Sequence, residues 1–179
     1  MKRLFYPAII ALLGGCASQV PIPIKEPPPG NPTVAEVRQD GPRFTGSAVR
    51  WGGVITQVEN KRDRTWVEVV SRELDSHGEP MSGSRSDGRF IASFPGFIDP
   101  IVYGAGQRLT VAGTIKGEST RPIGEYSYTF PIVTVSTSYL WGAEPEPARY
   151  DPPPPWYYDP WWPYYPGPFY HRPYPPYRW

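Results

Sequence analysis

Apolar and polar residues alternate along the middle of the chain and are punctuated by turn residues, which is the pattern of a small antiparallel β domain. The alternation starts near residue 47 and ends near residue 141. It predicts five strands, over residues 47–59, 65–74, 88–94, 109–117 and 126–135.

The first two predicted strands are joined by a charged hairpin turn over residues 60–64. Because successive side chains of a strand point to opposite faces, Val67 and Val69 share one face, and Trp66 lies on the other face or at the barrel end. Gly52 and Gly53 interrupt the first strand and predict a bulge or a sharp coil at which a small barrel turns a corner.

A short helix is predicted between the third and fourth strands. Asp99 has the character of a helix N-cap, Pro100 suits the first helical position, and Gly104 or Gly106 ends the element after one or two turns. In the last strand, Pro131 cannot donate to a ladder, so this point is expected at a sheet edge or a bulge.

Three strands, a short helix and two further strands follow the order of an OB-fold. We therefore expect an all-β fold, a small OB-like antiparallel barrel of five or six strands with one short helix. About 95 residues can bury a core large enough to fold alone. Another small β-sandwich or barrel is the alternative.

The chain begins with a pattern typical of a signal peptide. Lys2 and Arg3 precede an apolar run over residues 4–13, which is about half the roughly 20 residues that a membrane-spanning helix needs. Leu13, Gly14, Gly15 and Cys16 then resemble the lipobox of bacterial lipoproteins. A plain secretory peptide and an uncleaved signal anchor are the alternatives.

The lipobox resemblance implies cleavage between Gly15 and Cys16, a diacylglyceryl thioether on the cysteine sulfur and an acyl chain, such as palmitate, on the new amino terminus. Three acyl chains would hold the protein permanently at a membrane. Ala17 and Ser18 follow the cysteine, and neither is the aspartate that retains enteric lipoproteins in the inner membrane. The resemblance therefore implies an outer-membrane location, with this lipid as the sole covalent group and no other cofactor.

Prolines are concentrated at the two ends of the chain. Proline fixes φ and removes a donor, so residues 20–32 are expected to avoid helix and to form an extended polyproline II spacer that holds the domain off the membrane. Residues 33–39 are expected to form one helical turn or a short edge strand.

The C-terminal region is rich in proline, tyrosine and tryptophan, which predicts an extended polyproline II tail. Such aromatic residues suit a membrane interface, sugar rings of peptidoglycan or lipopolysaccharide, or a partner protein that binds proline-rich segments. A disordered extension without a partner is the remaining alternative. The candidate contact residues are Trp156, Trp161, Trp162, Tyr164 and Tyr165.

Charge and reactive residues exclude several classes of function. The 18 basic and 17 acidic residues leave a net charge of +1, so nucleic acid is not an expected partner. Cys16 is the only cysteine, so no internal disulfide can form. His77 and His171 are too few and too far apart in the sequence to predict a zinc site or a catalytic triad. No metal site and no catalytic residue is predicted. Glu68, Asp75 and Asp99 are the carboxylates that could form a catalytic pair, but Asp75 falls in a turn and Asp99 in a cap.

Several sequence blocks are similar to those of the Slp family, outer-membrane lipoproteins of Gram-negative bacteria named for starvation induction in an enteric member. The resemblance covers about residues 20–141, and the family offers no catalytic residue to transfer. The blocks are residues 51–55, 65–69, 74–80, 88–90, 96–100 and 109–117.

These features together divide the chain into four regions: a signal peptide over residues 1–15, a lipidated spacer over 16–40, a barrel domain over 41–141 and a tail over 142–179. The expected protein is a non-enzymatic, starvation- or stress-linked lipoprotein on the inner leaflet of the outer membrane, with its barrel facing the periplasm. It would bind or stabilise peptidoglycan, lipopolysaccharide or an envelope protein. A periplasmic receptor for a small molecule or glycan and an accessory subunit of an envelope complex are the alternatives.

Overall fold

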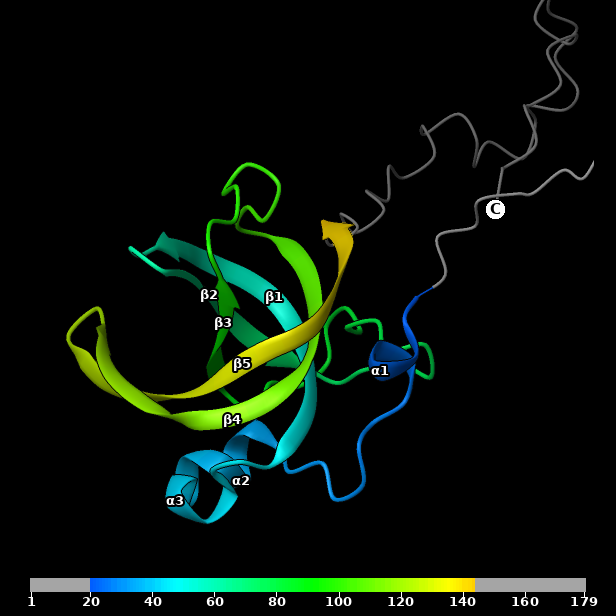
Figure 1. Ribbon diagram of the computed structural model, residues 1–179, viewed down its shortest axis with the longest axis horizontal. Helices are drawn as coiled ribbons and strands as arrows, with labels where there is room; N and C mark the ends of the chain where they lie inside the picture. Colours follow the sequence, from blue (N-terminus) through cyan, green and yellow to red (C-terminus); the bar gives the residue numbers. More distant parts are fainter. Residues whose placement is uncertain (1–19, 144–179) are drawn as a thin grey trace, which may run out of the picture. The chain divides into compact units, whose positions relative to one another are not determined.

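The computed structural model describes residues 20–143, which form one β-barrel with three short helices ahead of its first strand (Figure 1). The helices are α1 (Ile22–Lys25), α2 (Val34–Gln39) and α3 (Gly41–Phe44). The strands are β1 (Ala48–Asn60), β2 (Arg64–Arg72), β3 (Arg89–Pro95), β4 (Gln107–Ile123) and β5 (Tyr126–Ala143).

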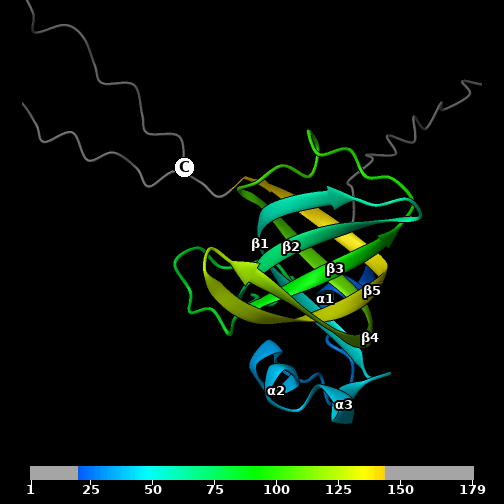
Figure 2. The same ribbon diagram turned by 90° about the vertical axis from the view of Figure 1, so that its left-hand side faces the viewer.

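The five strands close into a barrel in the order β1-β2-β3-β5-β4, with β4 returning to β1 (Figures 1 and 2). All neighbouring strands are antiparallel except β3 and β5, which pair in parallel from Ile91↔Ile132 to Ser93↔Thr134. The predicted all-β, OB-like small barrel is confirmed.

Gly52 and Gly53 lie where β1 pairs with both β2 and β4. A Cβ atom on Gly53 would lie 1.9 Å from the carbonyl oxygen of Val70, so no larger residue fits unless the backbone moves. The pairing of β1 with both neighbours is continuous at these two glycines, so the predicted bulge does not lie here. The register shift between β1 and β2 falls later, between Ile55 and Gln57.

The predicted sidedness of the second strand is confirmed. Val67 and Val69 are fully buried in the barrel. Trp66 lies on the other face, where Nζ of Lys61 is 4.0 Å from its ring centroid and the guanidinium of Arg121 is 5.6 Å from it.

Strands β4 and β5 are longer than predicted. β4 continues to Ile123 and forms a two-stranded hairpin with the start of β5, whereas the added residues of β5, 136–143, pair with the first half of β4. Residues 117–123 of β4 lack the alternation of apolar and polar residues that identified the other strands, and none of them is buried. Pro131 pairs with Glu118, and the ladder between β5 and β3 starts only at Ile132. Pro131 therefore lies at a sheet edge, as predicted.

The predicted helix between the third and fourth strands is wrong. Asp99 does act as a cap, because its Oδ1 accepts from the amide of Ile101 at 2.8 Å and its carbonyl oxygen accepts from the amides of Val102 and Tyr103. The element remains a tight turn. The first turn of a helix is unfavourable in free energy unless further turns follow it, and β4 begins at Gln107, so there is no room for further turns.

The expectation that residues 20–32 avoid helix is also wrong, because α1 forms there. Pro21 occupies the N-cap and Pro23 the first turn, where a missing N–H has no intrahelical partner to lose. The helix ends before Pro27, as the restriction on the residue preceding proline requires. Proline density over a stretch therefore does not exclude a helix when the prolines fall at its start.

Residues 33–39 take the helical alternative as α2. Its first turn is closed by a capping box, in which the amide of Glu36 donates to Oγ1 of Thr33 and the amide of Thr33 donates to Oε2 of Glu36 at 2.7 Å. These bonds, led by the one from the Thr33 amide, lower the pKa of Glu36. Val34 and Val37 then face the barrel and join its core.

Candidate functional site

The residues predicted to carry function lie outside the described part of the chain. Gly15 and Cys16 precede it. The five candidate contacts of the tail follow it: Trp156, Trp161, Trp162, Tyr164 and Tyr165. The lipid attachment and the tail contacts therefore stay predictions, and so do the boundaries of the four regions.

The barrel interior is filled by side chains. Trp51 and Phe90 meet edge to face with their ring centroids 5.3 Å apart, and α2 adds its valines to the same cluster. The core residues contributed by the strands are Val49, Trp51, Ile55, Val67, Val69, Phe90, Ala92, Phe94, Leu109, Val111, Ile115 and Val133. A ligand in the barrel axis would have to displace this core.

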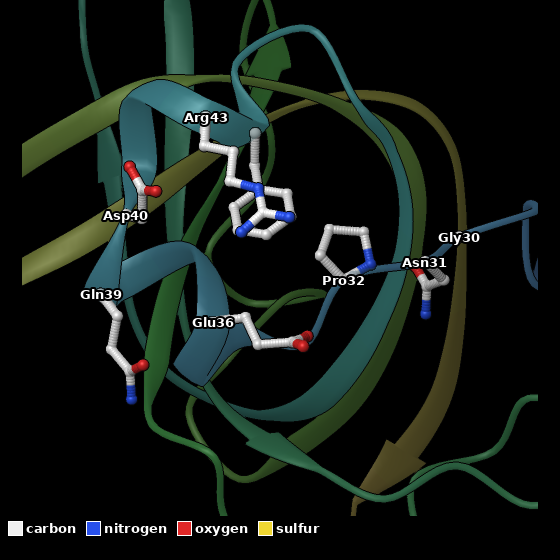
Figure 3. Close-up of a pocket in the computed structure, with 8 residues that line it drawn as sticks. Gly30, Asn31, Pro32, Glu36, Gln39, Asp40 and Arg43 are labelled. Atoms are coloured by element: carbon white, nitrogen blue, oxygen red, sulfur yellow. The ribbon is translucent and has the colours of Figure 1, made fainter.

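A polar hollow of about 420 Å³ lies outside the barrel, between residues 30–32 and the helices α2 and α3 (Figure 3). Its charged lining residues are Glu36, Asp40 and Arg43, all exposed. Glu36 is already engaged in the capping box, so the hollow offers few free groups that converge on a ligand.

Residues 20–33, which we call the N-terminal strap, are bound to the barrel through Arg50. The amide of Arg50 donates to Oδ1 of Asn31 at 2.8 Å, and Nη1 of Arg50 donates to the carbonyl oxygens of Ile24, at 3.1 Å, and Lys25. The guanidinium thereby satisfies carbonyls at the end of α1 that have no partner within the helix.

Two further contacts, at Ile24 and Pro32, hold the strap. Ile24 is fully buried, and its carbonyl oxygen would be 2.1 Å from a Cβ atom on Gly78. The carbonyl oxygen of Gly78 accepts from Oγ1 of Thr110 at 2.6 Å, which ties this loop to β4. Nε1 of Trp51 donates to the carbonyl oxygen of Pro32 at 2.7 Å. The expected free spacer is thus part of the folded domain from α1 onward.

The acidic residues considered for catalysis have separate structural partners. Oδ1 of Asp75 accepts from the amides of His77 and Glu79, both at 2.8 Å, and Oε1 of Glu68 accepts from Arg89 at 2.7 Å. Asp99 caps the turn before β4. Within residues 20–143 no three His, Cys, Asp or Glu side chains gather as a metal site would require.

One exposed apolar surface was not predicted from the sequence, because two of its residues, Ile101 and Val102, were assigned to the predicted helix and Phe97 was given no role. Residues 96–106 lie at the end of the barrel opposite α2 and α3 (Figures 1 and 2). The buried hydroxyl of Thr65 donates to the carbonyl oxygen of Gly96 at 2.8 Å and accepts from the amide of Ile98 at 3.0 Å. Nδ2 of Asn60 also donates to the carbonyl oxygen of Ile98, at 3.2 Å.

This framework leaves three apolar side chains pointing into solvent. Phe97 is 74% exposed, Ile101 is 89% exposed and Val102 is 52% exposed. We call these three residues the apolar tip. The signal that marks it in the sequence is a group of apolar residues between two strands that does not alternate and is interrupted by Asp99 and Pro100.

Among the described residues, no helix has the length and apolar character needed to cross a bilayer.

Comparison with known proteins agrees with the resemblance found in the sequence. The model of the outer membrane lipoprotein Slp family matches residues 13–170. The uncharacterized lipoprotein YeaY of Escherichia coli K12 is 33% identical over 171 residues, which cover 92% of this chain and 86% of the relative.

Two further relatives cover less of the chain. The outer membrane protein Slp of the same organism is 32% identical over 133 residues, or 73% of this chain and 69% of the relative. An uncharacterized protein of Haemophilus influenzae is 33% identical over 94 residues, or 52% of this chain and 51% of the relative. The chain belongs to the outer membrane lipoprotein Slp family.

Proposed function

We propose that this protein is a non-enzymatic envelope module, attached to the inner leaflet of the outer membrane by lipids on Cys16 and held close to that surface with its barrel in the periplasm. The lipids are a diacylglyceryl thioether and an N-acyl chain. Family membership supports the envelope role. The starvation link belongs to the proposal through the family resemblance alone.

The observation that carries the proposal is the docked strap. Only three residues separate Cys16 from Val20, where the described fold begins. Four Cα–Cα steps of extended chain span at most about 14 Å. If Cys16 is lipidated, the barrel therefore stays within a short distance of the bilayer instead of extending from it on a long proline spacer.

The filled barrel favours an envelope-binding or structural role over a small-molecule receptor. Receptor sites are usually concave, with a few polar groups that converge on the ligand. In this barrel, the side chains of Trp51 and Phe90 and the valines of α2 fill the interior that such a site would need. Partners would instead meet the outer surface or the tail.

Cys16→Ser tests the anchor. In cells fed labelled palmitate, the unchanged protein should take up the label and sediment with outer-membrane vesicles, whereas Cys16→Ser should do neither. Ser18→Ala is the matched control, and it should keep both properties. A Cys16→Ser protein that still carries the label would overturn the anchor. Protease digestion of intact and permeabilised cells reports the orientation, because a periplasmic barrel is cut only after permeabilisation.

The tail is proposed as a second contact with the envelope. Tyrosine and tryptophan favour the membrane interface, although peptidoglycan, lipopolysaccharide and an envelope protein are also open as partners. Deleting residues 152–179 from a non-lipidated chain should lower its binding to liposomes. Equal binding with and without the tail would rule out the interfacial role.

A further inference from the structure

We propose that a groove between the N-terminal strap and the outer face of the barrel binds one acyl chain of the lipid on Cys16. This inference rests on the lipid anchor proposed above and deepens it, because it gives part of that lipid a place on the folded domain. When the anchor is outside a bilayer, one of its chains is then covered by protein instead of water.

The groove has a volume of about 380 Å³ and lies beside α1, which packs on β4 and β5 from outside the barrel (Figure 1). Its wall on the strap side is formed by Ile22, Pro23, Pro27 and Pro28. The two isoleucines of α1 face different surroundings, because Ile24 is fully buried whereas Ile22 lines the groove and is 69% exposed. The strap therefore presents an apolar wall to an open space.

The floor of the groove is formed by short apolar side chains. Ala48 of β1 and Ala112 of β4 line it, and they point outward because their neighbours Val49 and Val111 belong to the core. The polar groups here are largely used within the fold. Oγ of Ser136 donates to the carbonyl oxygen of Ala112 at 3.0 Å, and the backbones of β1 and β4 pair with each other. The groove thus offers few hydrogen bonds to a sugar or a peptide, which favours hydrocarbon as its occupant.

The charge at the groove favours the lipid on Cys16 over other lipids. Glu26 is the one charged residue that lines the groove; it is exposed and makes no ion pair within residues 20–143. Its carboxylate repels a fatty acid or a phospholipid, in which the acyl chain is joined to an anionic group. The proposed lipid on Cys16 is attached through thioether, ester and amide bonds, none of which is charged.

The lipid is attached close to the groove along the chain. Only three residues separate Cys16 from Val20, and Ile22 follows two residues later. A ligand on so short a linker has an effective concentration on the order of millimolar. A closed apolar cavity of about 150 Å³ holds one benzene molecule, so a groove of about 380 Å³ has room for roughly 15 carbon atoms, close to one acyl chain. The groove therefore takes one of the three chains.

Binding of a free acyl chain tests the groove in the chain from residue 16 to residue 179 carrying Cys16→Ser, which removes the anchor. The probe is the methyl ester of cis-parinaric acid, which is uncharged and fluoresces more strongly in apolar surroundings. One probe should bind to each chain. Ile22→Ser should weaken its binding about tenfold, because an apolar side chain is lost from the wall. Ala48→Gln should also weaken it, because a longer polar side chain then covers the floor.

The matched control is Ile101→Ser, which removes another exposed isoleucine, 89% exposed, between β3 and β4. It should leave probe binding unchanged. If Ile22→Ser and Ala48→Gln bind the probe as tightly as Ile101→Ser, while all three keep the unfolding midpoint of the parent, the proposal is overturned. Deleting residues 152–179 should not change the affinity either; a gain in affinity would mean that the tail occupies the groove, and the proposal would fail.

Photocrosslinking identifies the occupant in the lipidated protein. Cells are fed palmitate that carries a diazirine, and the purified protein is diluted below the critical micelle concentration of its detergent and irradiated. Crosslinks should form within one chain, to peptides that contain residues 22–28 or 112–114. A labelled protein that crosslinks only to detergent or to other chains would overturn the proposal while the anchor stands. A protein without label on Cys16 would instead show that the anchor itself fails, and this occupant with it.

Discussion

The backbone amide of Arg50 donates to Oδ1 of Asn31 at 2.8 Å, while Nδ2 of Asn31 donates back to the carbonyl oxygen of Arg50 at 3.3 Å. The Asn31 side chain thus binds one residue of β1 in the manner of a neighbouring strand, although it belongs to the strap. This reciprocal pair joins a proline-rich stretch to a barrel 19 residues further along the chain.

Asn31→Ala should therefore loosen the strap. It leaves the amide and carbonyl of Arg50 without these partners, and the expected loss in free energy of unfolding is about 1–3 kcal/mol. Urea unfolding of the Cys16→Ser chain measures this loss, and limited proteolysis should cut within residues 20–33 sooner. Gln39→Ala is the control, because it removes an exposed amide that makes no hydrogen bond within residues 20–143, and it should change neither readout. Equal effects of the two changes would contradict the role assigned to Asn31.

Gly53→Ala should destabilise the barrel. The new Cβ would meet the carbonyl oxygen of Val70 at 1.9 Å, and this backbone atom can move only if β1 and β2 separate. The expected cost is about 3 kcal/mol. Thermal unfolding measures it against Gly104→Ala, whose Cβ would be 3.3 Å from the carbonyl oxygen of Pro100. A Gly53→Ala protein as stable as Gly104→Ala would show that β1 does not need a glycine there.

Thr65→Val keeps the shape of the side chain but removes its hydroxyl. The carbonyl of Gly96 and the amide of Ile98 then lose their shared partner, so the segment beneath the apolar tip should open more often. Hydrogen exchange at the Ile98 amide should become about tenfold faster. Thr120→Val, on the hairpin beyond the barrel, is the control. Unchanged exchange at Ile98 would mean that Asn60 alone holds the segment.

The stability of the loop next to the strap should depend on pH through Asp75. Partial burial alone would raise its pKa, but the amides of Glu79 and His77, together with the His77 ring, outweigh this effect and hold the pKa of Asp75 below its usual value. A lowered pKa in the folded state means that the stabilisation is present above the pKa of the unfolded chain and disappears as the pH falls through the folded value. NMR titration of the carboxyl carbon should find the lowered pKa.

The same argument gives the behaviour of Asp75→Asn. This variant should be less stable than the unchanged protein near neutral pH, and the difference should shrink as the pH falls below the folded pKa of Asp75. A difference that stays constant through the acid range would show that the hydrogen bonds to Asp75 do not depend on its charge. The loop also carries Gly78, which lies against the carbonyl oxygen of Ile24 in the strap. The rate of proteolysis within the strap therefore provides a second readout of the loop.

The strands were predictable because their signal is local. A strand that buries one face must place apolar residues at every second position, and Val67 and Val69 meet this rule within three residues. The glycine pair in the first strand also gave a local signal, since glycine inside a strand often marks a place where another backbone approaches closely, as Val70 approaches Gly53. In residues 117–123 of β4, where no side chain is buried, the alternation was missing and the end of the strand was not predicted.

The helices were harder to place because short elements depend on their surroundings. The turn at Asp99 has the cap and the proline of a helix start, yet it ends after one turn because β4 must begin at Gln107. The helix α1 has prolines that suggested extended chain, yet it forms because the barrel buries Ile24 and because Arg50 receives the free carbonyls at its end. In both places tertiary contacts outweighed local preference.

The sequence by itself determined the all-β class, the approximate strands and the family, and it predicts lipid attachment at Cys16. The tertiary structure decided that the strap is docked, that the barrel is filled and that Phe97 is presented at its end. The physical reason is the distance along the chain over which each feature is encoded. Alternation and motifs involve neighbouring residues, whereas Asn31 with Arg50 and Thr65 with Ile98 meet only after the barrel has closed.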